Sequence, residues 1–255
     1  MDTHTDSLDP RAFLDFEVVE WLRRSGGRET FSTGPLPSAP AGYVVKRSVG
    51  SVAKDDWHER LRGRRARSPG QREFDALVRL AEDGLPVPRA ITFCEERVFG
   101  GVRRSLVVME RVVHADTVRD RLAVLEARER RALCERVLEI VVRLHARGWY
   151  HRDLYLQHFV ICADGGALVL LDVGRARRER RPRSRWFVKD LAALAHSAPA
   201  RVTAREKLRF AAAWLDAHGV RDREERRRWL RAIVAKRARM AARVPRDERS
   251  LAGVR

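Results

Sequence analysis

Hydrophobic and polar positions follow a strand-like period in the first third of the chain and a helical period over most of the remainder. The stretch YVVKRSV, residues 43–49, alternates and is rich in β-branched residues, which predicts a strand. FEVVEWL, ITFCEERVF and SLVVMERV predict three more strands. Between the first and second pairs, QREFDALVRLAEDG places Glu73, Leu77 and Leu80 at helical spacing and stops at Gly84, which predicts a helix closed by a glycine.

The second half carries a long helix and then a hairpin. Residues 126–147 predict an amphipathic helix ended by Gly148, with one apolar face made by Leu133, Val137, Ile140, Val141 and Leu144. FVICADGGALVLLD contains two apolar runs about an Asp-Gly-Gly turn, which predicts a β-hairpin. The remainder is expected to be helical.

Capping boxes mark two of the C-terminal helices: Thr203 with Glu206, and Asp222 with Glu225. Strands followed by helices predict an α+β fold of two unlike lobes, which we assign to residues 1–112 and 113–255. We expect about the first 12 residues to be disordered.

Composition allows a real core, since 44% of the 255 residues are hydrophobic. The three cysteines lack CxxC spacing and suggest neither a disulfide framework nor a zinc site. The acidic N-terminal stretch lacks the pattern of a secretory signal, and no apolar run is long enough for a membrane span. We therefore expect a cytoplasmic protein, either soluble or peripheral at the inner face of the cytoplasmic membrane.

The net charge of +18 predicts a surface that attracts anions such as nucleic acid, anionic lipid head groups or phosphorylated sugars. An Arg-rich composition spread over solvated faces explains the same number. Where the charge clusters is therefore more informative than its sum.

Phosphoryl transfer needs a cation for the nucleotide phosphates, metal ligands and a carboxylate that orients the attacking hydroxyl. Lys46 ends the apolar part of the predicted strand 43–49, and Glu73 begins a helix 27 residues later. Glu73 shares a helix face with Leu77 and Leu80, so its carboxylate could turn inward and pair with Lys46. Alternatively, Lys46 is a solvated strand-end residue and Glu73 is a first-turn acid favoured by the helix dipole.

The stretch YHRDLYLQHF lies between the long helix and the hairpin, which is the context of a kinase catalytic loop. The second hairpin strand ends at Asp172 in LLDVG, so we expect Asp153 and Asp172 to reach one cleft. A carboxylate after an apolar strand suits a metal, and Gly174 lets the backbone turn away. The alternative makes His151-Arg152-Asp153 a loop salt bridge and Asp172 a turn residue.

The chain resembles kinases of the protein-kinase fold, and more closely the bacterial lipopolysaccharide kinases that phosphorylate inner-core heptose or Kdo sugars. The resemblance rests on HRDLYLQHFV, LLDVGRAR, REFDALVRLAEDGLPVPRA and VKDLAALAHSA, and covers roughly residues 43–198. One feature that separates these sequences from ordinary protein kinases is His158, in the position where the latter carry Asn.

The resemblance implies ATP and Mg²⁺ as cofactors, with Mn²⁺ as the alternative metal. Lys46 would contact the α- and β-phosphates of ATP and Glu73 would orient Lys46. Asp153 would be the catalytic base and Asp172 the main metal ligand. His158 would occupy the position of a second metal ligand.

Four further residues complete the predicted site. Arg152, counted with the catalytic residues, would brace the loop. Asp190, placed at the start of a helix beginning near Lys189, would hold the loop backbone by hydrogen bonds. Glu110 and Val112, next to the predicted lobe boundary, are assigned to cofactor binding.

Two departures from the kinase pattern leave alternatives open. Before Lys46 there is no clear Gly-x-Gly-x-x-Gly, and Gly26 and Gly27 fit either a phosphate-covering turn or a surface turn. Mg²⁺ prefers oxygen ligands and imidazole suits softer metals. His158 could therefore bind the metal, bond to Asp153 or a phosphate, or favour Mn²⁺.

The segment after Asp172 is the most basic of the chain, with seven arginines from Arg175 to Arg185 against Glu179 alone. Arginine forks match carboxylates and phosphates, so we expect an acidic glycan or lipid head group as acceptor. The segment is short and lacks the Ala-Pro-Glu element of protein kinases.

Residues 201–255 carry 17 Lys and Arg against 7 acidic residues, which fits either contact with an anionic inner membrane or a solvated helical face.

Three functions follow from these observations. The first is ATP-dependent phosphorylation of a sugar hydroxyl in lipopolysaccharide core or a similar acidic glycolipid. The second is a protein Ser/Thr kinase or a small-molecule kinase. The third is a basic nucleic-acid-binding or scaffold pseudokinase. The aromatic residues argue against this function, because they form no stacking ladder of the kind that single-strand binders use.

Overall fold

The computed structural model describes residues 20–25, 27–35, 39–49, 67–98, 101–164, 166–181 and 183–242. The expectation of disorder for the N-terminal residues, the assignment of Gly26, and the part of the basic C-terminal region beyond residue 242 lie outside them. The chain divides into two compact units. One comprises Met1–Val113 with Asp172–Arg175, and the other comprises His114–Leu171 with Ala176–Arg255.

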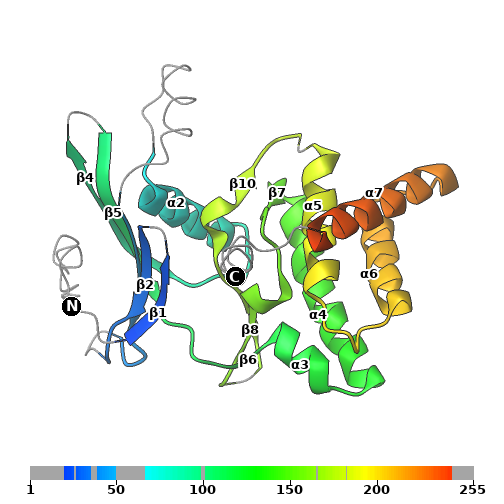
Figure 1. Cartoon of the computed structure of the whole chain (residues 1–255), viewed down its shortest axis with the longest axis horizontal. Helices are drawn as coiled ribbons and strands as arrows, with labels where there is room; N and C mark the ends of the chain where they lie inside the picture. Colours follow the sequence, from blue (N-terminus) through cyan, green and yellow to red (C-terminus); the bar gives the residue numbers. More distant parts are fainter. Residues whose placement is uncertain are drawn as a thin grey trace, which may run out of the picture. The chain divides into compact units, whose positions relative to one another are not determined.

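The first unit is built on a five-stranded antiparallel sheet in the order β1-β2-β3-β5-β4 (Figure 1). Its strands are β1 (Glu20–Ser25), β2 (Arg28–Ser32), β3 (Tyr43–Val49), β4 (Ala90–Val98) and β5 (Gly101–Glu110). The strand predicted from YVVKRSV has the bounds of β3. The other three predicted strands overlap β1, β4 and β5, so the sequence located four of the five strands and missed β2.

Strand alternation separates the two faces of this sheet, because successive side chains of β3 point to opposite sides. One face holds the buried cluster of Phe31, Tyr43, Val45, Leu106 and Val108. Lys46 lies on the other face, and its side chain contacts Glu73 of the helix α2 (Pro69–Glu82). The predicted helix is confirmed: Ser68 caps its first turn, and Gly84 follows it with φ of 75°.

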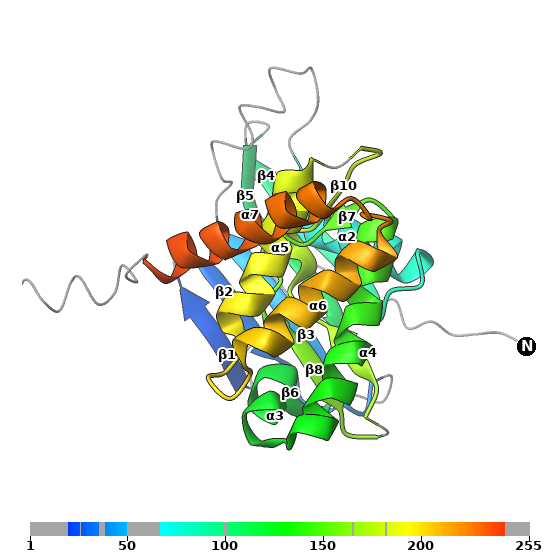
Figure 2. The ribbon, with the colours of Figure 1, turned by 90° about the vertical axis from the view of Figure 1, so that its right-hand side faces the viewer.

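The second unit is mainly helical. Figure 2 shows α4 and α6 side by side, with α5 and α7 also packed against each other. Its helices are α3 (Val118–Val124), α4 (Ala127–Ala146), α5 (Ser184–Ser197), α6 (Ala204–Ala217) and α7 (Arg223–Ala241). The predicted long helix is α4, which buries the five apolar residues of its predicted face.

Short strands complete the second unit. The predicted hairpin is present as the antiparallel pair β8 (Phe159–Cys162) and β9 (Leu168–Leu170), and β6 (His114–Thr117) joins it at the edge of β8. The strands β7 (Trp149–Tyr150) and β10 (Arg177–Arg178) form a second small sheet.

The start of α5 corrects one prediction. The helix begins at Ser184, five residues before the expected start at Lys189, and Asp190 therefore lies in its middle. The arginine-rich residues before Lys189 show no helical spacing of apolar side chains, so the sequence did not predict the first turn of α5. Tertiary contacts support this turn instead: the ring of Trp186 stacks on Tyr150 at 5.1 Å, and Phe187 lies 5.8 Å from Trp214.

Both predicted helix caps are present. Thr203 and Glu206 form a reciprocal capping box at the start of α6. The carboxylate of Asp222 accepts a hydrogen bond from the backbone N–H of Glu225 at the start of α7.

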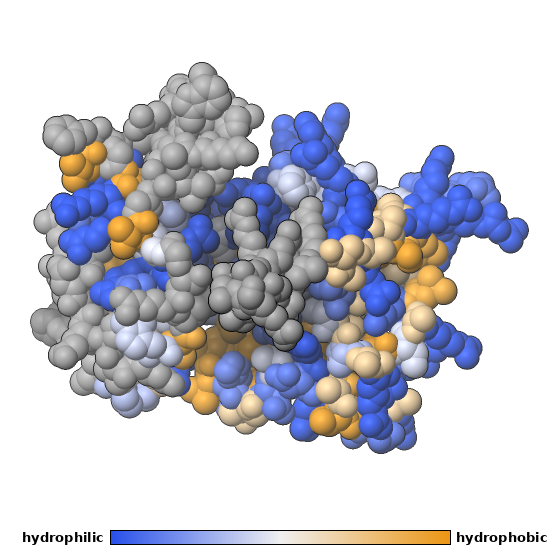
Figure 3. Space-filling model, in the orientation of Figure 1, coloured by the Kyte–Doolittle hydropathy of each residue, from blue (hydrophilic) through white to orange (hydrophobic). Residues whose placement is uncertain are grey.

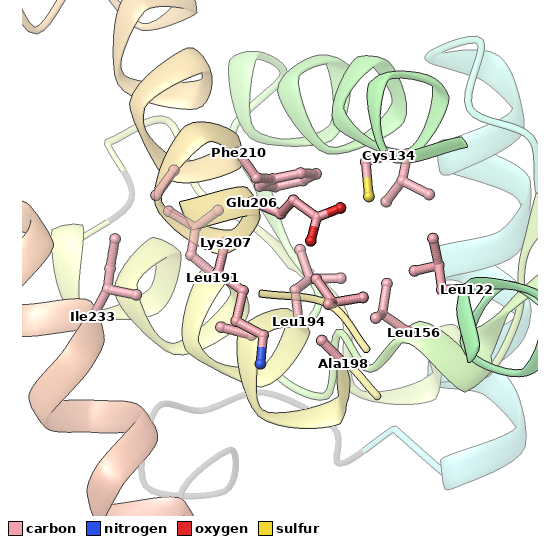
Figure 4. Close-up of a pocket in the computed structure, with 14 residues that line it drawn as sticks. Leu122, Cys134, Leu156, Leu191, Leu194, Ala198, Glu206, Lys207, Phe210 and Ile233 are labelled. Atoms are coloured by element: carbon pink, nitrogen blue, oxygen red, sulfur yellow. The ribbon is translucent and has the colours of Figure 1, made fainter. Parts of the chain in front are cut away.

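The helices of the second unit also enclose an apolar pocket (Figure 4). Its lining includes the side chains of Leu122, Val137, Leu194, Phe210 and Ile233. Glu206 and Lys207 are the charged residues of the lining. None of the residues that the sequence assigns to catalysis or cofactor binding lines this pocket.

Candidate active site

The loop that carries Asp153 runs from β7 to the short 3-10 helix η2 (Leu156–His158). Within it, Arg152 has φ of 76°, in the left-handed region that residues other than glycine seldom adopt. Such a backbone conformation persists only where surrounding contacts hold it. The loop is thus a constrained turn.

Asp190 of α5 supplies contacts that hold the loop. Its side chain is fully buried, and its two oxygens accept hydrogen bonds from the backbone N–H groups of His151 at 2.6 Å and Arg152 at 2.8 Å. The hydrogen bonds expected between this residue and the loop backbone are therefore present. Bonds from a charged acceptor are stronger than those between neutral groups, so this carboxylate fixes the backbone immediately before Asp153.

His145 and Trp214 form a chain of side-chain contacts that ends at Asp190. The sequence did not identify these two residues. The indole Nε1 of Trp214 donates to Nδ1 of His145 at 3.0 Å. The imidazole therefore carries its proton on Nε2, which lies 3.4 Å from Oδ2 of Asp190. His145 stands close before the loop in HARGW, but its indole partner lies 69 residues away in the chain and could not be inferred.

Replacing Asp190 with Ala should destabilise the protein by about 3–5 kcal/mol, because the change leaves the buried or partly buried backbone donors of His151 and Arg152 without an acceptor, at about 1–3 kcal/mol for each donor. Urea unfolding would measure the loss. Asp216→Ala is the matched control, since Asp216 pairs with Arg221 and Arg226 at the surface and should contribute at most about 1 kcal/mol. Equal losses in the two variants would contradict a structural role for the buried carboxylate.

Asp153 itself is partly exposed, and two side chains approach it. The Nζ atom of Lys189 lies 3.5 Å from Oδ1 of Asp153, and Nδ1 of His158 lies 2.9 Å from its carbonyl oxygen. A carbonyl only accepts, so Nδ1 of His158 donates and a neutral ring carries its lone pair on Nε2. Of the alternatives left open for His158, a bond to Asp153 is present but is made to the backbone, and Nε2 is the nitrogen suited to a metal. Lys189 was not identified from the sequence.

In the first unit, Lys46 brings two carboxylates together. Its Nζ atom lies 2.6 Å from Oε1 of Glu73 and 2.9 Å from Oδ1 of Asp172. Burial alone would lower the pKa of Lys46, but the two carboxylates outweigh burial and raise it, so the ammonium stays charged. The predicted ion pair with Glu73 is present, and Asp172 joins it.

The segment around Asp172 is shaped for this contact. Asp172 has φ of 57°, also in the left-handed region, and 46% of its side chain is exposed. Two residues later, a Cβ atom on Gly174 would lie 2.8 Å from Oε2 of Glu73. Glycine is therefore the residue that lets the Asp-Val-Gly turn approach α2 this closely.

The remaining predicted cofactor-binding residues lie on the sheet and just after it. Gly27 occupies the turn between β1 and β2 with φ of 75°, and Ser25 pairs with Arg28 across that turn. Glu110 ends β5, and its carboxylate pairs with Arg89 at 3.1 Å. Val112 follows β5 and is half-buried. The contacts of these residues leave their role in nucleotide binding a prediction.

The donor set suits a metal that is shared with a substrate. Over the part of the chain that the structure describes, no three His, Cys, Asp or Glu side chains gather as a metal site. Mg²⁺ is usually bound by one or two carboxylates together with substrate phosphates, not by an all-protein cage. The exposed carboxylate of Asp172 fits that mode of binding.

Comparison with known proteins identifies the family of this chain. The model of the lipopolysaccharide kinase (Kdo/WaaP) family matches residues 17–214. The lipopolysaccharide core heptose(I) kinase WaaP of Pseudomonas aeruginosa is 34% identical over 76% of this chain and 78% of its own length. The protein of the same name from Escherichia coli is 28% identical over 70% of this chain and 72% of its own length.

A solved structure described as WaaP in complex with acyl carrier protein has the same fold. It matches with a TM-score of 0.66 and 27% identity, over 91% of this chain and 90% of the solved chain. The strand-rich first part and the helical second part are those of a protein-kinase-like α+β fold. Together, the matched family model and these relatives show that the chain belongs to the lipopolysaccharide kinase (Kdo/WaaP) family of phosphotransferases.

Proposed function

We propose that this protein transfers the γ-phosphoryl group of ATP to a sugar hydroxyl of the lipopolysaccharide inner core, with heptose as the first candidate and Kdo as the second. The observation that carries the proposal is the position of Lys46, which pairs at once with Glu73 and Asp172. A partly buried cation beside an exposed carboxylate suits nucleotide phosphates and their metal. Relatives named core heptose(I) kinases support heptose as the acceptor.

Each residue takes one role in this proposal. Lys46 binds the α- and β-phosphates and Glu73 orients it. Asp172 would hold Mg²⁺, or Mn²⁺ as the alternative, and Nε2 of His158 is the candidate for a second ligand. The metal would neutralise charge on the nucleotide phosphates. The turn at Gly26 and Gly27, with Glu110 and Val112, would contact the rest of the nucleotide.

Asp153 acts as the base, and Arg152 braces its loop. The sugar hydroxyl oxygen attacks the γ-phosphorus and forms the new P–O bond. The bond from this phosphorus to the bridging oxygen of ADP breaks, and its electron pair leaves on the β-phosphate. The hydroxyl proton passes to the carboxylate of Asp153, which the hydrogen bonds from His151 and Arg152 to Asp190 hold in place.

The arginine-rich segment of the second unit supports an acidic acceptor. The start of this segment forms the strand β10, in which Arg177 and Arg178 pair with Tyr150 and Trp149 of β7 as neighbouring antiparallel strands. Beyond it, the side chains of Arg180, Arg181, Arg183 and Arg185 are exposed. The guanidinium of Arg185 lies over the ring of Trp186 at 4.7 Å, so an aromatic surface adjoins the charges. Such a surface suits a sugar that carries carboxylate or phosphate groups.

Contact with an anionic membrane surface is part of the proposal. The described C-terminal helices expose Arg227, Arg228, Arg231, Arg237 and Arg239 on α7. Figure 3 shows hydrophilic residues over much of this unit, with apolar residues scattered among them. Each basic residue close to an anionic leaflet contributes about 1 kcal/mol. Among the described residues, no helix is both long and apolar enough to cross a bilayer.

We also propose two functional lobes. Residues 1–112 would bind the nucleotide, and residues 113–255 would carry catalysis and bind the acceptor. The units of the structure differ from these bounds in two respects, since Val113 and the segment Asp172–Arg175 both belong to the first unit.

Labelled ATP should transfer phosphate to deacylated lipopolysaccharide core, and much more slowly to core whose carboxyl groups have been reduced to alcohols. The reason is that the arginine segment would lose the carboxylate groups among its anionic partners. Label on each acceptor, measured beside casein and RNA at equal concentrations, checks this. Faster labelling of casein would favour a protein kinase. Binding of RNA without transfer to any acceptor would favour the scaffold function.

A further inference from the structure

Lys189 lies beside the carboxylate that we assign as the base, although the sequence assigned it no role beyond the expected start of a helix. Its Nζ atom is 3.5 Å from Oδ1 of Asp153, and about one fifth of each side chain is exposed. Both residues belong to the second unit. A positive charge thus lies next to the group that must face the acceptor hydroxyl.

We propose that Lys189 is a catalytic residue that contacts the phosphoryl group during its transfer and offsets the negative charge that develops there. The proposal rests on the proposed function, because it takes Asp153 as the base. It adds a second lysine to the reaction, separate from Lys46 and carried by α5.

Distances make this contact reachable. An acceptor oxygen bonded to its base lies roughly 2.6–3.2 Å from the carboxylate. That oxygen must come to roughly 3–3.5 Å from phosphorus before attack. An ammonium already 3.5 Å from Oδ1 of Asp153 therefore needs only a change of side-chain rotamer to reach a phosphoryl oxygen.

The ion pair is not needed to hold the loop. The next residue of α5, Asp190, already binds the loop backbone through the N–H groups of His151 and Arg152. A partly exposed ion pair at 3.5 Å contributes little to stability by itself. The same turn of α5 therefore carries Asp190, which binds the loop backbone, and Lys189, whose charge lies beside the carboxylate of Asp153.

Charge explains why a cation is useful at this place. The carboxylate of Asp153 and the phosphate groups of ATP are both negative and repel each other as the acceptor approaches. A lysine shared between them reduces this repulsion. In the transition state it also donates to the phosphoryl oxygens, where preorganised donors have their largest effect.

Replacing Lys189 with Met, which keeps the length and removes the charge, should lower kcat by about 100-fold, as loss of one preorganised donor does. The KM values for ATP and for lipopolysaccharide core should change by less than about threefold, because the contact strengthens only in the transition state. Lys189→Arg should recover at least about tenfold over the Met variant, since it restores the charge. Steady-state kinetics on deacylated core measure all three values.

Lys236→Met is the matched control, because Lys236 is a half-buried lysine of the same unit on α7. It should retain the kinetics of the unchanged protein. A kcat for Lys189→Met within about threefold of that of the unchanged protein would overturn the proposal. Equal losses in the Met and Arg variants, together with a lower melting temperature, would show a structural role and overturn it as well.

ATP hydrolysis, with water in place of the sugar, separates this proposal from the proposed function. Should the unchanged protein hydrolyse ATP but leave the core unlabelled, the assigned acceptor is wrong. The Lys189 variants then still report on phosphoryl transfer to water. A loss of hydrolysis in Lys189→Met with recovery in Lys189→Arg supports the role of the lysine, and undiminished hydrolysis in the Met variant refutes it.

Discussion

Asp153→Asn should lower kcat for phosphoryl transfer by about 1,000-fold, which lies within the range for loss of a general base. Asparagine keeps the size of the side chain and its place in the loop but cannot take the hydroxyl proton. The affinity for ATP should stay within about twofold, because our assignment places the nucleotide on Lys46, Glu73 and Asp172. Steady-state kinetics and calorimetric titration with ATP measure the two effects separately.

The fold should survive this change. The loop backbone is held by Asp190, which the substitution leaves intact. Asp164→Asn is the matched control, since Asp164 is an exposed aspartate of the same unit in the turn after β8. If Asp153→Asn kept kcat within about tenfold of the unchanged protein, the assignment of the base would be wrong.

Lys46→Met should lower kcat/KM for ATP by about 100- to 1,000-fold, because a preorganised cation for the phosphates is lost. It should also destabilise the protein by about 1–3 kcal/mol, since the side chain of Glu73, which is 11% exposed, loses its partner. Kinetics at limiting ATP and urea unfolding measure the two losses.

A double variant separates these two effects. Lys46→Met with Glu73→Gln removes the stranded charge, so stability should recover while kcat/KM for ATP stays low. Arg47→Met is a control in the same strand, because Arg47 pairs with Glu29 at 3.0 Å on the other face of the sheet. It should retain ATP kinetics. Recovery of activity in the double variant would show that Lys46 acts only by balancing Glu73.

Local pattern predicted most of the elements that carry the site. Alternation located β3 and placed Lys46 on the face opposite Val45, and helical spacing placed Glu73 on the inner face of α2. These predictions succeeded because strand and helix periods are properties of neighbouring residues. The start of α5 was missed because its first turn depends on rings from other elements, Tyr150 and Trp214.

The support behind the catalytic loop could not be inferred in the same way. The chain from Trp214 through His145 to Asp190 joins three helices, and no period relates these residues. The position of Lys189 beside Asp153 likewise joins residues 36 apart in the chain. Only the folded chain brings such groups into contact.

The sequence by itself determined the order of the kinase motifs and most of the strands and helices that carry them, and it left the pairing of Lys46 with Glu73 as one of two alternatives. The tertiary structure decided that Asp172 joins this pair and that the ring of His158 bonds to the backbone of Asp153. It also decided that Lys189 lies beside the carboxylate of Asp153. The physical reason is range. Side-chain periodicity follows from local backbone geometry, whereas ion pairs between distant segments depend on how the elements pack.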